Sequence, residues 1–184
     1  MARQYLADDG FLEPAIADPL AADTATTAVG IHGVNSYRYA LIPAFDARPG
    51  KVYLYEAAGL ITTAATGALT ISPSIGTSGT AAGATLGASI AQTVPVSSLS
   101  GPWYLHLKMV CSATGAIGAN STMRGWGFFI AGGVAATANS GLQVVFGGTN
   151  AAFDHSVANT IWISKTLSVA GSWTTQYIDL STMN

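Results

Sequence analysis

The sequence predicts an all-β protein: an antiparallel β-sandwich of jelly-roll-like form, preceded by an extended N-terminal arm. Three observations lead to this prediction. Several segments alternate apolar and polar residues with the two-residue period of a strand buried on one face. Short Gly- and Pro-containing sequences typical of turns separate them, such as Arg48-Pro49-Gly50 and Gly76-Thr77-Ser78-Gly79. No stretch has a convincing helical period, because glycines interrupt even the alanine-rich residues Thr80–Ala91.

The alternation is clearest in Trp103–Cys111, where every second residue is apolar and His106 and Lys108 fall on the other face. In Thr160–Leu167 the isoleucines share one face, and Trp162 falls on the polar face. The segment Trp173–Leu180 is mixed on both faces, as expected of an edge strand or a subunit contact. The predicted strands are Tyr37–Ile42, Lys51–Glu56, Ala68–Ile75, Thr85–Val94, Trp103–Cys111, Thr122–Ala131, Leu142–Phe146, Thr160–Leu167 and Trp173–Leu180.

The first residues differ from the rest of the chain. Residues 1–34 hold five of the nine acidic residues and two prolines, so we expect an extended arm there and a sandwich domain over residues 35–184. Apolar residues in the arm would anchor it, either on the chain's own sandwich or on a neighbouring chain. These candidate anchors are Tyr5, Leu6, Phe11, Leu12, Ile16 and Leu20.

Low charge is the most unusual property of the composition. Only 9% of the residues are charged and 49% are hydrophobic, whereas a typical soluble domain is about 25% charged. A surface with so few charges suits packing against other subunits. The net charge of -2 and the lack of a Lys/Arg run argue against a nucleic-acid partner.

Apolar stretches are too short to cross a bilayer, which needs about 20 residues. The first residues also lack the apolar core of a signal peptide. We therefore expect no membrane partner, and synthesis in a cytoplasm without processing.

No catalytic, cofactor or metal site is predicted. The three histidines, His32, His106 and His155, have no spacing typical of metal ligands, and no nucleophile elbow occurs. The single cysteine, Cys111, falls on the apolar face of its strand and is expected in the core. Gly125-Trp126-Gly127 is interpreted as a packing element, with small residues around a large ring.

Two other tryptophans suggest an alternative function. Trp162 and Trp173 have polar neighbours, and an exposed indole can stack on a sugar ring. This favours a tail-associated or carbohydrate-binding sandwich if they are exposed. Core or subunit-interface positions are the other possibility.

Six short sequences carry a resemblance to a known family: Gly67–Leu69, Gly76–Thr80, Leu86–Ser89, Pro102–Leu105, Gly115–Gly118 and Trp173–Gln176. Over roughly residues 50–180, the chain resembles small virion proteins of tailed bacteriophages, the capsid decoration or head-fibre group. The resemblance implies a non-enzymatic cement protein on the outside of the phage head, which stabilises the head by binding the major capsid protein and copies of itself, often as a homotrimer. The arm would then be a capsid-binding element.

Overall fold

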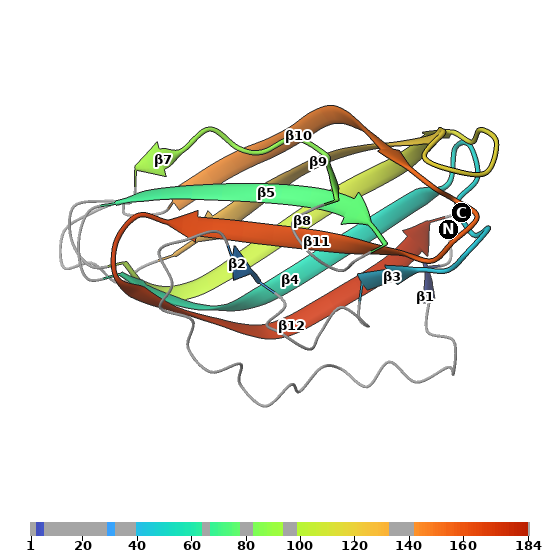
Figure 1. The fold of residues 1–184 in the computed structure, drawn as a ribbon. Helices are drawn as coiled ribbons and strands as arrows, with labels where there is room; N and C mark the ends of the chain where they lie inside the picture. Colours follow the sequence, from blue (N-terminus) through green and yellow to red (C-terminus); the bar gives the residue numbers. More distant parts are fainter. Residues whose placement is uncertain are drawn as a thin grey trace.

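Two antiparallel β-sheets pack face to face in the computed structural model (Figure 1). The structure describes residues 3–5, 29–31, 40–63, 67–77, 83–93, 99–132 and 142–183, and these contain no α-helix. The predicted all-β class and the β-sandwich are therefore confirmed.

The two sheets differ in the length of their strands. Sheet A contains long strands and one short edge strand, in the order β1 (Arg3–Tyr5), β12 (Gly171–Met183), β4 (Val52–Thr63), β8 (Ser100–Ala113), β9 (Ser121–Ala131) and β10 (Leu142–Phe153). Sheet B has two long strands, in the order β2 (Val29–Gly30), β11 (Asn159–Leu167), β5 (Ala68–Gly76) and β6 (Ala84–Thr85), with β3 (Leu41–Ile42) beside β11 and β7 (Gln92–Thr93) beside β5.

The chain passes between the sheets at most of its long connections. It crosses from β4 to β5, from β7 to β8, from β10 to β11 and from β11 to β12, as strands do in a jelly roll. Strands β8, β9 and β10 instead follow one another as neighbours in sheet A, which gives this sheet a three-stranded meander. The meander supplies a wide, continuous face.

Most predicted strands are present, and several are longer than the alternation indicated. The strand predicted from Lys51 continues to Thr63, and the strand predicted from Leu142 continues past a bulge to Phe153. Among the residues predicted as Tyr37–Ile42, the structure describes Ala40–Ile42, of which Leu41–Ile42 form β3.

The prediction of one strand over Thr85–Val94 is wrong. Two short strands, β6 and β7, flank an irregular segment around Gly87, whose φ of 109° is left-handed. A Cβ at Gly87 would lie 2.6 Å from the carbonyl oxygen of Gly147 in β10, so the backbone of the irregular segment meets that of β10 there. The close approach requires glycine and breaks the regular strand.

Aromatic rings fill the core between the sheets. The indole of Trp103 lies 4.7 Å from that of Trp173 and 5.9 Å from the ring of Phe129, measured between centroids. The Nε1 of Trp103 donates hydrogen bonds to the carbonyl oxygens of Leu60 and Thr174, both at 3.2 Å. Stacking and hydrogen bonding together fix β8 against β4 and β12.

One core position is occupied by a basic residue. The alternation of β11 directs Lys165 inward together with Ile163 and Leu167, and its side chain is 1% exposed. The Nζ atom lies 5.7 Å from the centroid of the Trp173 ring, a cation–π geometry. The core therefore contains a positive charge against an aromatic face.

Cys111 lies in the core, as predicted. Its thiol is fully buried and points to the carbonyl oxygen of Ala113 at 3.6 Å. Burial raises the pKa of this thiol, so the reactive thiolate is disfavoured.

Parts of the predicted arm belong to the two sheets. Strand β1 pairs with the last strand, with Arg3 opposite Met183 and Tyr5 opposite Ser181. Strand β2 pairs with β11. The other candidate anchors lie outside the described residues: Leu6, Phe11, Leu12, Ile16 and Leu20.

Candidate functional site

The outer face of sheet A, which points away from sheet B, carries exposed large hydrophobic side chains and several charged ones. Alternation in β8 directs Leu105 and Leu107 into the core and leaves His106 and Lys108 on this face. The strand register places outward residues of β12, β4, β8, β9 and β10 in rows across the sheet. The rows form an apolar half, a polar centre and a basic end.

The apolar half contains large hydrophobic side chains exposed to solvent. Val145 is 69% exposed, and Leu60, Ile130 and Tyr177 are between 41% and 46% exposed. The register joins them into one surface, because Tyr177 lies opposite Ala58, Ala58 opposite Tyr104, and Tyr104 opposite Ile130. We define the apolar half as the following outward-facing residues: Ala58, Leu60, Pro102, Tyr104, Phe128, Ile130, Val145 and Tyr177. None of them carries a formal charge at neutral pH.

The polar centre is a small hydrogen-bonded cluster. The hydroxyl of Tyr104 donates to Oε1 of Glu56, and Nδ1 of His106 lies 3.6 Å from the same oxygen. The ring of His106 stacks on Phe128, with centroids 5.3 Å apart and an interplanar angle of 13°. Contacts within the sheet thus hold these polar groups at the border of the apolar half.

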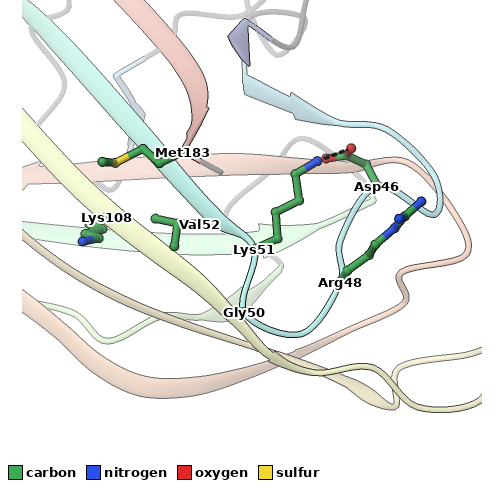
Figure 2. Close-up of a pocket in the computed structure, with 7 residues that line it drawn as sticks. All are labelled: Asp46, Arg48, Gly50, Lys51, Val52, Lys108 and Met183. Atoms are coloured by element: carbon green, nitrogen blue, oxygen red, sulfur yellow. Dashed lines mark hydrogen bonds and ion pairs between the residues drawn. The ribbon is translucent and has the colours of Figure 1, made fainter. Parts of the chain in front are cut away.

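The basic end lies where the loop before β4 meets the outer face. A hollow of about 590 Å³ is lined there by Asp46, Arg48, Gly50, Lys51, Val52, Lys108 and Met183 (Figure 2). Figure 2 shows Lys51 directed to Asp46, while Lys108 lies beyond Val52 on the neighbouring strand. Most of the charge of the outer face is therefore at this end.

Asp46 is held by Lys51, which also lines the hollow, and by Tyr53 of the core. Lys51 forms an ion pair with Oδ1, and the hydroxyl of Tyr53 donates to Oδ2 at 2.9 Å. Burial, with the Asp46 carboxylate, raises the pKa of Tyr53 far above its ordinary value, so this hydroxyl stays a donor. No described residue forms an ion pair with Arg48 or Lys108.

The tryptophans occupy positions that the sequence alone left open or misjudged. Trp173 is 2% exposed, so it is a core residue. Trp162 is half-buried and packs over Gly30, where a Cβ would lie 2.0 Å from the indole. Interpreting Trp126 as a packing element is wrong, because its side chain is 50% exposed.

The flanking glycines do pack, and they explain the exposure of Trp126. Gly125 and Gly127 face the core, where a Cβ at Gly127 would lie 2.5 Å from the ring of Phe146. The residue between them must point outward. The sequence contains evidence for this orientation, because residues two apart in a strand face the same side and Trp126 is two residues from both Arg124 and Phe128.

The described histidines lie in separate places. His106 is on the outer face, whereas His155 lies in the loop between β10 and β11. Nδ1 of His155 is 2.9 Å from Oγ of Ser121, and that serine is fully buried. His32 lies outside the described residues.

Neighbouring backbone and hydroxyl groups hold Asp154 in the same loop. Its Oδ1 accepts hydrogen bonds from the amide and the hydroxyl of Ser156, at 2.9 Å and 2.6 Å. Across the part of the chain that the structure describes, no group of three or more His, Cys, Asp or Glu residues is placed to hold a metal ion.

The loop of Asp154 is expected to loosen in acid. The hydrogen bonds from Ser156 lower the pKa of Asp154 below its ordinary value of 3.8. Their stabilising effect is present above the unfolded-state pKa and is lost as the pH falls through the lower folded-state pKa. We expect the amide resonance of Ser156 to titrate with a midpoint below 3.8 in NMR spectra. A midpoint above that value, or the same titration in Asp154→Asn, would contradict the assignment.

No protein-family model matches the chain, and no curated protein or solved structure matches it significantly. Within the described ranges, no helix is long and apolar enough to cross a membrane.

Proposed function

We propose that this protein is a non-enzymatic structural protein of a virion, a decoration (cement) protein that binds the outside of a phage head and stabilises it. In this proposal the apolar half of the outer face joins copies of the protein to one another, and the assembled copies bind the major capsid protein. The observation that carries the proposal is the exposure of Leu60, Ile130, Val145 and Tyr177 on one continuous sheet face. Contiguous exposed apolar surface of this kind marks interaction sites.

The chemistry of the apolar half favours a second copy as its partner. An interface between identical surfaces brings like residues together, so charged groups would repel or lose their hydration. The apolar half has no formal charge at neutral pH. It can therefore pack on itself without that penalty.

The apolar half extends across five neighbouring strands of sheet A, β12, β4, β8, β9 and β10. Low overall charge, at 9% of residues, supports the same use.

Self-association is tested by adding charge to the apolar half. We expect the double variant Ile130→Lys, Val145→Lys to weaken the oligomer at least about 100-fold, because lysines in the interface must lose water and face each other. Light scattering after size exclusion gives the mass of the oligomer, and a dilution series measures its dissociation. The matched control is Ile90→Lys, which changes an isoleucine that is 81% exposed outside this face.

A monomeric wild-type protein, or equal dissociation of the control and the double variant, would overturn the role given to the apolar half. The virion role has its own test. Mass spectrometry of gradient-purified phage particles from the strain that encodes the chain should detect it in the heads. Heads that lack the gene product should lose DNA at lower temperature than complete heads. Its absence from purified particles would overturn the proposed function.

A further inference from the structure

The basic end of the outer face contains an aromatic platform. Trp126 is 50% exposed and lies opposite Gly147 in β10, at a bulge between Gly147 and Asn150. Gly147 and Gly148 have left-handed φ angles of 111° and 90°, and a Cβ at Gly148 would lie 3.7 Å from Nε1 of Trp126. Because Gly147 and Gly148 have no side chains to cover it, the indole has an open surface beside them.

The bulge is locked in place by the surrounding backbone. A Cβ at Gly147 would lie 2.2 Å from the carbonyl oxygen of Gly125, and its amide donates to the carbonyl oxygen of Gly87 at 2.9 Å. A larger residue at Gly147 would push β10 away from β9. The platform is thus part of a rigid sheet.

Cationic side chains flank the platform on both sides. Lys108 is the register partner of Trp126 in β8, and directly opposed residues have Cβ atoms about 5 Å apart. Arg124 lies two residues along β9 on the same face, and its Nε donates to Oδ1 of Asn150 at 2.5 Å. That bond orients the guanidinium and does not use its two terminal amino groups.

Lys108 also connects the platform to the hollow of Figure 2. Arg48, Lys51 and Lys108 line the hollow and Arg124 lies beside Lys108, so this end holds four of the seven Lys and Arg residues of the chain. Among the residues that line the hollow, Asp46 is acidic, and it forms an ion pair with Lys51. In a chain of net charge -2, this is a local concentration of positive charge.

We propose that this end binds an acidic carbohydrate, with one pyranose ring stacked on Trp126 and its carboxylate held by Lys108 and Arg124. An aromatic face matches the apolar face of a sugar ring, and ammonium and guanidinium groups form strong hydrogen bonds with a carboxylate. Further sugar units extend along the hollow toward Arg48. This binding uses other residues than the proposed self-association: Trp126 borders the apolar half at Phe128, but Trp126, Lys108 and Arg124 do not belong to it.

The charge balance favours a sugar acid over a nucleic acid. Phosphate backbones require many clustered cations, and their binding weakens steeply with salt. This chain is net negative, and Arg48, Lys108 and Arg124 are the cations of this end beyond the Lys51–Asp46 pair. A carboxylated ring needs only one or two of them.

The test uses the full chain and NMR titration of the indole resonances. The probes are a hexamer of galacturonic acid and a hexamer of sialic acid, which separate a uronic from a sialic ligand. We expect at least one to shift the Trp126 indole resonance, which is assigned by its loss in Trp126→Ala. Trp126→Ala and Lys108→Gln should each weaken binding about tenfold or more, and so should methyl esterification of the galacturonate hexamer, which removes its charge.

Tyr177→Ala is the matched control, since it removes an exposed aromatic ring from the apolar half of the same face. It should leave hexamer binding unchanged. The proposal is overturned if neither hexamer shifts the Trp126 resonance at about 5 mM, a concentration that detects even weak complexes. Equal binding of the methyl ester, or tighter binding of a short oligothymidylate, would overturn it as well. Because the oligomer and virion measurements do not involve sugar, a failure here is distinguishable from a failure of the proposed function.

Discussion

Replacing Trp103 with alanine is expected to lower the free energy of unfolding by about 3–5 kcal/mol, the range for removing a large aromatic ring from a core. The ring is 2% exposed and stacks on Trp173 and Phe129. Its Nε1 also satisfies the carbonyl oxygens of Leu60 and Thr174. The substitution leaves a cavity between the sheets and two carbonyl groups without this donor.

Urea denaturation followed by circular dichroism measures this change. Trp103→Phe keeps a ring but removes the donor, so its smaller loss separates packing from hydrogen bonding. Trp126→Ala is the matched control, because it removes an exposed indole and should change stability by less than about 0.5 kcal/mol. If Trp103→Ala unfolds at the same urea concentration as the wild type, this account of the core is wrong.

Reversing the charge at Lys165 is expected to be comparably destabilising. Lys165→Glu places a carboxylate against the face of Trp173, where the ammonium now lies 5.7 Å from the ring centroid. The negative face of the ring repels an anion, and an uncompensated buried charge costs about 3–5 kcal/mol. We therefore expect Lys165→Glu to lose more than about 3 kcal/mol of stability at neutral pH.

Lys165→Met is the matched control, because methionine fills a similar volume without a charge. It should lose less stability than Lys165→Glu in the same urea titration, because it places no anion against the ring of Trp173. Equal losses in Lys165→Glu and Lys165→Met would show that charge at this position is unimportant and that packing alone determines the effect.

The strands could be predicted where one face of a segment is apolar. In β8 and β9 the alternation identifies the inward residues, including Trp103, Cys111 and Phe129. It failed over Thr85–Val94, where polar and apolar residues also alternate but the edge strand is interrupted. The interruption depends on the backbone contact between Gly87 and Gly147, two residues far apart in the sequence.

The candidate site was harder to predict than the strands. The flanking glycines favour a packing role for Trp126, but the two-residue alternation of β9 places it on the outer face together with Arg124. Trp173, in a segment mixed on both faces, is in the core because a bulge between Thr175 and Tyr177 shifts the alternation of β12. Such a bulge reverses which residues face inward, and no local pattern marks it.

The sequence by itself determined the all-β class, the positions of most strands and the shortage of charge, because these depend on local alternation, turn residues and composition. Only the tertiary structure decided that exposed apolar residues form one half of a single face and that four basic residues gather toward its other end, two of them beside Trp126. The reason is physical: strand order and register bring together residues from five strands that are distant in the chain. A low count of charges predicts a surface suited to assembly, and the pairing of strands determines where that surface lies.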